Sequence, residues 1–347
     1  MKFILPIILI ISVLILPVSA SELTAPTVPK AGADYMPQNS NAFGEGLLEL
    51  AKKAIASLRP DIREASQLCL GVFGIVLVTS LTQPLSGKTM KITELIGVVS
   101  IGCLLLQRTN ALIHLGVNTV EELSSYGKLL LPVMTTAMAA QGGITGSTAL
   151  YTGTALFSGL LSTLISSILT PLIYLFLAMS AGNRALGEEV LKKFRDFIKW
   201  LMTWSLKIIL YVFTVYMGIT GVVSGTTDAA ALKAAKLTIS GVVPVVGGIL
   251  SDASEAVLVG AGVVKNAAGI YGIFAVLALC VNPFLRIGSH YIMLKVTGGL
   301  CSVFGSKGVC DFVNDFSTAM GLLLAMTGSV CLLLLISTVC FLRGVAG

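Results

Sequence analysis

The side chains best placed to do chemistry in this chain are charged residues inside an otherwise apolar segment, residues 236–266. Lys236 and Lys265 stand near its two ends, and Asp252 and Glu255 lie between them. Carboxylates three residues apart share one helix face, and in a membrane protein they could hold a cation or line an aqueous path. The same spacing suits a helix start, with Asp252 as the N-cap and Glu255 as its N3 partner. The two interpretations are compatible.

The backbone of this segment is interrupted at its middle by Pro244, Gly247 and Gly248. A helix that crosses a bilayer without interruption needs about 20 apolar residues, and neither half of the segment supplies them. Non-helical backbone at membrane depth survives only where protein or water covers its free polar groups. The sequence therefore predicts a re-entrant or broken element that is enclosed by other helices.

The remainder of the chain has the composition of a membrane protein. Of its 347 residues, 55% are hydrophobic and only 12% are charged, and the mean hydropathy is +0.92. Ordinary soluble domains carry about 25% charged residues. Together with repeated apolar runs of membrane length, this composition predicts an all-α, polytopic integral membrane protein.

The motifs argue against several classes of function. The sequence contains no HExxH, GxSxG, phosphate-binding or dinucleotide-binding motif, so we expect neither an enzyme nor a cofactor. The seven cysteines are scattered and form no CxxC pair, which favours buried, inert thiols over a metal site. The net charge of +6 is not gathered into basic blocks, so we expect no nucleic-acid partner.

The N-terminus has the pattern of a secretory signal peptide, residues 1–20. Lys2 supplies a positive charge, an apolar stretch follows, and a small-residue cleavage site ends at Ala20. Residues 21–65 are then expected to form an exported linker and an amphipathic helix, which Pro60 ends or kinks. That helix could lie on the membrane surface, bind a partner or pack on this protein's own bundle.

Residues 66–347 are predicted to form a multi-span membrane domain. The expected spans lie near 68–82, 92–106, 149–181, 201–223, 267–285 and 317–342, and the re-entrant candidates are 127–145 and 236–266. The run 149–181 is longer than one bilayer requires, so it forms either one tilted helix or a tight hairpin.

Two basic segments between these spans are expected at the cytoplasmic surface, by the positive-inside rule. Residues 184–199 keep helical spacing of their apolar side chains, which predicts a surface helix that leads into the span at 201–223. Arg286, His290 and Lys295 are expected in a second basic loop.

The central segment also resembles a known family. Pro244-Val245-Val246-Gly247-Gly248, then Ser251-Asp252-Ala253 and Glu255, and then Lys265-Asn266 are similar to stage III sporulation protein AE of endospore-forming bacteria. Asn282-Pro283 and Asp315 fit the same pattern. The resemblance implies no catalytic residue. It indicates nine candidates for a pore-lining or structural role: Lys236, Pro244, Gly247, Gly248, Ser251, Asp252, Glu255, Lys265 and Asn266.

The resemblance implies a mother-cell protein in the outer membrane around the forespore. Such proteins are expected to join other stage III sporulation membrane proteins of the same operon, and forespore-side partners, in a channel-like transenvelope complex that links the two cells. Two other functions stay open: a stand-alone secondary transporter with a discontinuous helix, and a structural membrane scaffold. Transporters usually carry an inverted repeat, and the chain has no second copy of the PVVGG–SDA pattern.

Overall fold

The computed structural model describes residues 25–37, 43–82, 90–141, 143–186, 189–242 and 247–343. Within 221–242 and 247–265, and at a few helix ends, it describes the helical backbone without the side chains. The predicted signal peptide, residues 1–20, lies outside the described residues.

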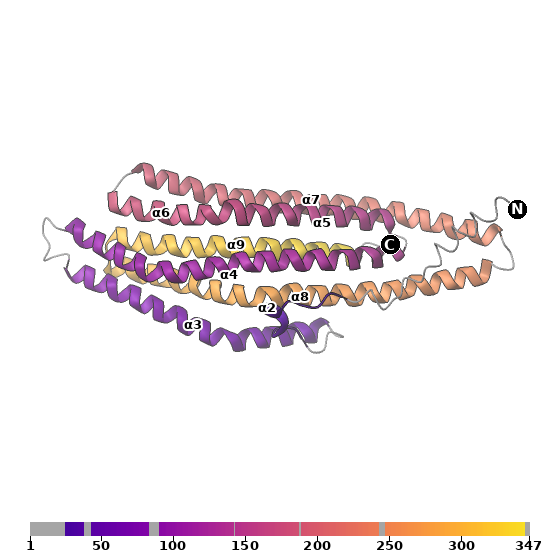
Figure 1. The fold of residues 1–347 in the computed structure, drawn as a ribbon, viewed down its shortest axis with the longest axis horizontal. Helices are drawn as coiled ribbons and strands as arrows, with labels where there is room; N and C mark the ends of the chain where they lie inside the picture. Colours follow the sequence, from indigo (N-terminus) through magenta and orange to yellow (C-terminus); the bar gives the residue numbers. More distant parts are fainter. Residues whose placement is uncertain are drawn as a thin grey trace.

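The described residues form a bundle of long helices that alternate in direction along the chain (Figure 1). We call the two ends of the bundle the Lys307 end and the Arg343 end, after the two ends of the last helix. No strand occurs in the described ranges. The helices are α2 Lys30–Ala33, α3 Phe43–Thr82, α4 Met90–Ala140, α5 Ile144–Leu164, the π-helical turn η4 Ile165–Leu169, α6 Thr170–Leu186, α7 Glu189–Val242, α8 Gly247–Phe304 and α9 Lys307–Arg343.

Six helical stretches within the described residues are long and apolar enough to cross a membrane. They lie on α3, α4, α5 to α6, α7, α8 and α9, so the prediction of an all-α, polytopic membrane protein is confirmed. These stretches hold 31 to 49 residues. That is about 46 to 74 Å of helix, against a hydrocarbon core about 30 Å thick. Each helix is therefore long enough to cross the bilayer and to continue beyond it.

Two helices are longer than predicted because polar segments continue them. α3 runs through Pro60 without ending, so the amphipathic helix and the first span are one element. α4 joins the span near 92–106 to residues 127–140, and no separate re-entrant element forms at 127–145. The chain reverses directly after α4, where the Gly143 amide donates a hydrogen bond to the Met138 carbonyl at 3.2 Å.

The run 149–181 forms one crossing rather than a hairpin. α5, η4 and α6 follow one another without a reversal, and Pro171 stands in the first turn of α6, directly after η4 (Figure 1). The Thr170 hydroxyl donates to the Ile165 carbonyl at 2.8 Å. Proline lacks an N–H and crowds the preceding turn of an α-helix, and a π-turn relieves that crowding. The π-turn therefore accommodates Pro171 inside a continuous span.

α8 and α9 form the centre of the bundle. In the apolar 18-residue segments of α8 and α9, 67% and 61% of the residues are buried inside the protein. In the other four stretches the corresponding share is 22% to 44%. Glycines bring α4 close to α9: a Cβ added to Gly116 or Gly127 would lie 2.6 or 2.8 Å from Leu323 or Leu334. Small residues of this kind are typical of tight helix packing in membranes. The apolar character of α8 and α9 thus serves protein packing more than lipid contact.

The first half of α3 and the segment before it pack on α8. The rings of Phe43 and Phe274 are stacked with their centroids 5.3 Å apart. Gly32 of α2 lies against the α8 backbone, where an added Cβ would be 3.0 Å from the Leu279 nitrogen. Among the interpretations of the amphipathic helix, the structure therefore favours packing on the protein's own bundle. Residues 25–37 are packed on α8 and do not form a loose linker.

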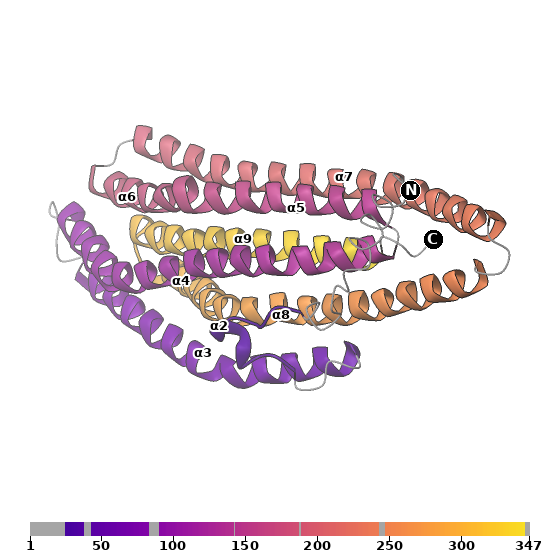
Figure 2. The same ribbon diagram turned by 45° about the vertical axis from the view of Figure 1, so that its right-hand side comes forward.

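At the Arg343 end, the end of α7 and the start of α8 extend past α4, α5 and α9 as a two-helix arm (Figures 1 and 2). α7 ends at Val242 and α8 begins at Gly247. Pro244 itself lies outside the described residues, and Gly248 belongs to α8. The predicted re-entrant element is not confirmed, because in both views the arm lies beyond the bundle and is not enclosed by it.

The two predicted basic segments are helical as well. Residues 189–199 belong to α7 and continue into the span at 201–223 without interruption, so no separate surface helix forms. Arg286 and His290 lie on α8, which runs through Pro283 to Phe304. The prediction of a basic loop at these residues is therefore wrong.

Candidate functional site: two ion-pair networks between the helices

A carboxylate between three helices organises the first network. Asp315 of α9 accepts a hydrogen bond from the Arg195 guanidinium of α7 at 2.7 Å and another from the Ser180 hydroxyl of α6. The Arg184 guanidinium of α6 lies 3.3 Å from the carboxylate of Asp311 and 4.0 Å from that of Asp315. The network joins α6, α7 and α9 near the Lys307 end.

Burial makes the first network energetically important. The side chains of Asp315 and Arg195 are only 13% and 10% exposed. Breaking a buried ion pair on one side leaves an uncompensated charge, which costs about 3–5 kcal/mol. Asp196, with a side chain that is 55% exposed, pairs with Arg195 at 2.8 Å. The geometry suits a clamp that holds three helices together, since the Asp315 carboxylate pairs with Arg195 and accepts a hydrogen bond from Ser180 inside the bundle.

A second network joins α3, α4 and α8 further along the bundle. Glu64 of α3 pairs with Arg108 of α4 at 2.5 Å and with Arg286 of α8 at 3.5 Å. Arg286 also pairs with Asp61, one turn before Glu64, at 3.4 Å. Two carboxylates thus face two guanidiniums, and the four side chains are neutral in sum. The Asp61 side chain is 14% exposed, whereas the two arginine side chains are 45% and 41% exposed.

His290 of α8 is next to the second network and is 2% exposed. Its Nδ1 atom lies 2.8 Å from the carbonyl oxygen of Arg286. Because a carbonyl oxygen only accepts, Nδ1 carries the proton of the neutral ring. The Nε2 atom is buried and has no hydrogen-bond partner among the described residues. The imidazole therefore holds an unused acceptor atom inside the bundle.

Matched helix lengths bring the second network together. Glu64 stands 18 residues before Thr82, the last residue of α3; Arg108 stands 18 residues after Met90, the first of α4. Arg286 stands 18 residues before the last residue of α8. All three of these helix ends lie at the Lys307 end (Figure 1). The ion pairs place the three charged residues at one level, about 27 Å of helix from the described ends of α3, α4 and α8.

Among the site residues predicted from the sequence, Asn266 alone has a described side chain, and it belongs to neither network. Asn266 is exposed on α8. The others lie on the arm or at its base, and their side chains are outside the described residues: Lys236 on α7, Gly247, Gly248, Ser251, Asp252, Glu255 and Lys265 on α8, and Pro244 between the helices. Their pore-lining or structural role stays a prediction.

The sequence does not indicate which charged residues pair with one another in either network. Arg184 and Arg195 belong to the basic segment 184–199, and Asp315 belongs to the family pattern, but nothing in the sequence pairs them. Asp61 and Glu64 carry no motif at all, because they lie in a polar stretch next to a proline. The equal 18-residue spacing of the second network can be read only once the chain reversals are known.

The described residues contain no group of three or more His, Cys, Asp or Glu side chains that could hold a metal ion. Five of the seven cysteines are buried. The chemistry that the two networks supply is therefore charge pairing between helices.

A family model described as stage III sporulation protein AE matches residues 39–343. The chain is also similar to the stage III sporulation protein AE of Bacillus subtilis (strain 168), with 23% identity over 238 residues. This similarity covers 67% of the chain and 59% of that relative, so the chain spans less than two thirds of the curated protein it matches. No solved structure matches the chain.

Proposed function

The chain belongs to the stage III sporulation protein AE family, and from this premise we propose that it is the membrane subunit of a channel-like transenvelope complex linking mother cell and forespore. Family membership gives it a role in sporulation, and its six apolar helices make it a membrane protein. In the proposal the chain resides in the mother-cell-derived outer forespore membrane. Its partners are other stage III sporulation membrane proteins of the same operon and components on the forespore side, and the complex supports forespore development.

The observation that carries the proposal is the two-helix arm of α7 and α8. The arm leaves the bundle at the Arg343 end, past the ends of α4, α5 and α9 (Figure 2). A stand-alone bundle gains nothing from two helices that extend without lateral cover. A subunit that must meet partners outside its own membrane needs such an extension.

The distribution of charge supports an exported position for the arm. Arg184, Lys192, Lys193, Arg195 and Lys199 lie at the opposite, Lys307 end, and such a cluster favours the cytoplasmic side. On the same part of α7, Trp200 and Trp204 are exposed and stacked, with ring centroids 5.5 Å apart. Exposed tryptophans are typical of a membrane–water interface. The Arg343 end and the arm then face the space between the two membranes.

Cysteine accessibility across the arm tests the proposal. In a cysteine-free version of the chain, single cysteines are placed in turn at positions 249 to 262. They are labelled with a membrane-impermeant thiol reagent in sporulating cells before the forespore is fully enclosed, while the space between the two membranes is still open to the medium. We expect labelling along one helix face that includes positions 252 and 255. In cells that lack the other operon proteins, the labelled set should widen, because partners no longer cover the arm. Labelling that is absent with and without those proteins would contradict the proposal.

A stand-alone secondary transporter is the second candidate, and the second ion-pair network favours it. Ionisable side chains inside a membrane bundle often line ion or proton pathways. A transporter would work without the other operon proteins, and its arm labelling would not depend on them. A structural scaffold would instead require Asp252 and Glu255 only for protein accumulation, with no effect on forespore development once the protein level is restored.

A further inference from the structure

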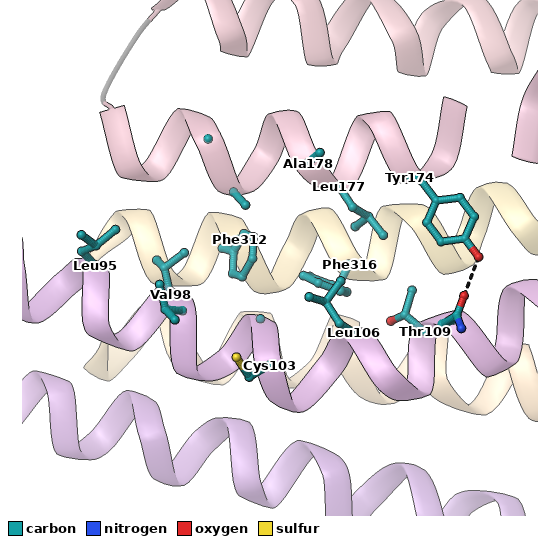
Figure 3. Close-up of a pocket in the computed structure, with 15 residues that line it drawn as sticks. Leu95, Val98, Cys103, Leu106, Thr109, Tyr174, Leu177, Ala178, Phe312 and Phe316 are labelled. Atoms are coloured by element: carbon teal, nitrogen blue, oxygen red, sulfur yellow. Dashed lines mark hydrogen bonds between the residues drawn. The ribbon is translucent and has the colours of Figure 1, made fainter. Parts of the chain in front are cut away.

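A pocket of about 660 Å³ lies between α4 and α6, with α9 as its floor (Figure 3). Fifteen residues line it, and none of them is charged. The polar contact in the pocket is at one end, where the Tyr174 hydroxyl donates to the Asn110 side-chain oxygen at 2.6 Å. The α4 wall runs from Leu95 to Asn110, and the α6 wall from Tyr174 to Gly182.

The pocket opens sideways between α4 and α6. Its floor is buried, with Phe312 2% exposed and Phe316 1% exposed. Its rim residues are exposed, among them Val99 at 55%, Leu106 at 52% and Cys103. Both walls belong to helical stretches that can cross a membrane. The open side of the pocket therefore faces the medium that surrounds these spans.

The dimensions of the pocket decide which kind of molecule can enter it. The α4 wall is 15 residue steps long, about 22 Å, and the α6 wall is 8 steps long, about 12 Å. Dividing the volume of about 660 Å³ by these lengths gives a cross-section between about 30 and 55 Å². A partner helix with side chains is 10–12 Å across and needs about 80 Å² or more. A single hydrocarbon chain is about 4 Å wide at van der Waals contact and fits.

We propose that this pocket binds one acyl chain of a glycerophospholipid from the surrounding bilayer. The Leu95 and Gly182 end of the pocket is nearest the Lys307 end, so the lipid headgroup lies on that side. The chain then runs parallel to the helices, over Phe312 and Phe316, toward Tyr174. A lipid leaflet is about 15 Å thick in its hydrocarbon part, which lies between the lengths of the two walls. The bound chain fills the gap between α4 and α6 and stabilises their packing on α9.

The test uses a variant that fills the pocket. A Cβ added to Gly102 would lie 3.7 Å from the Phe312 ring, an ordinary contact, so Gly102→Leu places its bulk in the pocket without a backbone clash. Ala178→Leu fills the pocket from the opposite wall and serves as the second variant. The matched control is Gly74→Leu on α3, where an added Cβ meets nothing within 4 Å.

Purified full-length protein is reconstituted into nanodiscs of phosphatidylethanolamine and phosphatidylglycerol. A small fraction of the phosphatidylglycerol carries a photoreactive diazirine on one acyl chain, and cross-linked residues are mapped by mass spectrometry. We expect cross-links concentrated on the pocket residues of α4, α6 and α9. In both filling variants these cross-links should fall by roughly tenfold, the change that about 1.4 kcal/mol of lost contact produces. Gly74→Leu should leave them unchanged.

Two results would overturn the acyl-chain site. Cross-links spread evenly over the exposed apolar residues, and unchanged by Gly102→Leu and Ala178→Leu, would mean non-specific lipid contact. Pocket residues protected from the lipid cross-link in nanodiscs whose mass shows two copies of the chain would mean that a second protomer covers the pocket. Variants are compared only when they elute as monodisperse protein. Because the purified chain is used alone, failure here leaves the proposed sporulation complex untouched.

Discussion

At the scale of single residues, the most consequential side chain described is Asp315. It accepts hydrogen bonds from Arg195 and Ser180, and it lies where water reaches little of it. A charge in this position is tolerated only because its partners are in place. The sequence alone shows Asp315 as an acidic residue near the start of a span, which does not distinguish a partnered charge from a helix-end residue.

Replacement of Asp315 should destabilise the bundle strongly. Asp315→Asn removes the negative charge and leaves the Arg195 guanidinium buried without it, so we expect the free energy of unfolding to fall by about 3 kcal/mol. Thermal unfolding of the purified protein in detergent measures the change. Asp196→Asn is the control, because that exposed partner of Arg195 should contribute less than about 1 kcal/mol. Equal effects of the two substitutions would show that burial does not set the strength of this network.

At the scale of helices, the close contact between α5 and α7 depends on a glycine. A Cβ added to Gly153 would lie 2.0 Å from the Tyr216 ring, and the Tyr216 hydroxyl donates to the Ala149 carbonyl at 3.1 Å. The ring is held by this hydrogen bond and by Phe157, whose centroid is 5.9 Å away. It cannot move aside without losing both contacts.

Substitution at Gly153 should therefore separate α5 from α7. For Gly153→Leu we expect a loss of about 1–3 kcal/mol, the usual range for overpacking. The control is Gly159→Leu on the same helix, where an added Cβ meets nothing within 4 Å and where leucine favours the helix over glycine. Comparison of the two unfolding temperatures measures the difference. A Gly153→Leu protein as stable as the Gly159→Leu protein would contradict the described α5–α7 packing.

Most of the apolar helices could be predicted from the sequence, and their ends could not. All six predicted spans fall inside described helices, because a long apolar run has few alternatives to a membrane helix. Three stretches outside the predicted spans continue α4, α7 and α8, although they are more polar than a span: residues 107–126, 189–199 and 286–304. A prediction based on apolar runs of membrane length ends each helix at the point where polar residues begin. Packing on neighbouring helices, which the sequence does not display, keeps these stretches helical.

At the scale of the whole molecule, the alternating helices fix which connections share a side of the membrane. The α4–α5 turn near Gly143 lies at the Arg343 end, and the α8–α9 turn at Ser306 lies at the Lys307 end (Figure 1). Six crossings, one for each stretch, would place the start of α3 and the end of α9 on the same side. This arrangement holds whichever face of the membrane either end occupies.

Labelling of the two turns tests this arrangement. In a cysteine-free chain expressed in intact cells, we expect Gly143→Cys to react with a membrane-impermeant maleimide. Ser306→Cys should react only after the membrane is permeabilised, because the basic Lys307 end faces the cytoplasm. Reversed labelling would keep the fold and invert the proposed orientation. Reaction of both cysteines in intact cells would contradict the six-helix arrangement.

The matched spacing of the second network limits how the chain can change length. One residue inserted between Glu64 and the end of α3 would raise Glu64 by about 1.5 Å and rotate it by about 100°, away from Arg108 and Arg286. The number of residues between the second network and the Lys307 end must therefore stay matched in α3, α4 and α8. A single insertion or deletion in one of these helices is tolerated only with matching changes in the other two helices. The arm extends past α4, α5 and α9, so its length is not tied to theirs. Differences in length between members of the family should therefore occur in the arm, and not between the second network and the Lys307 end.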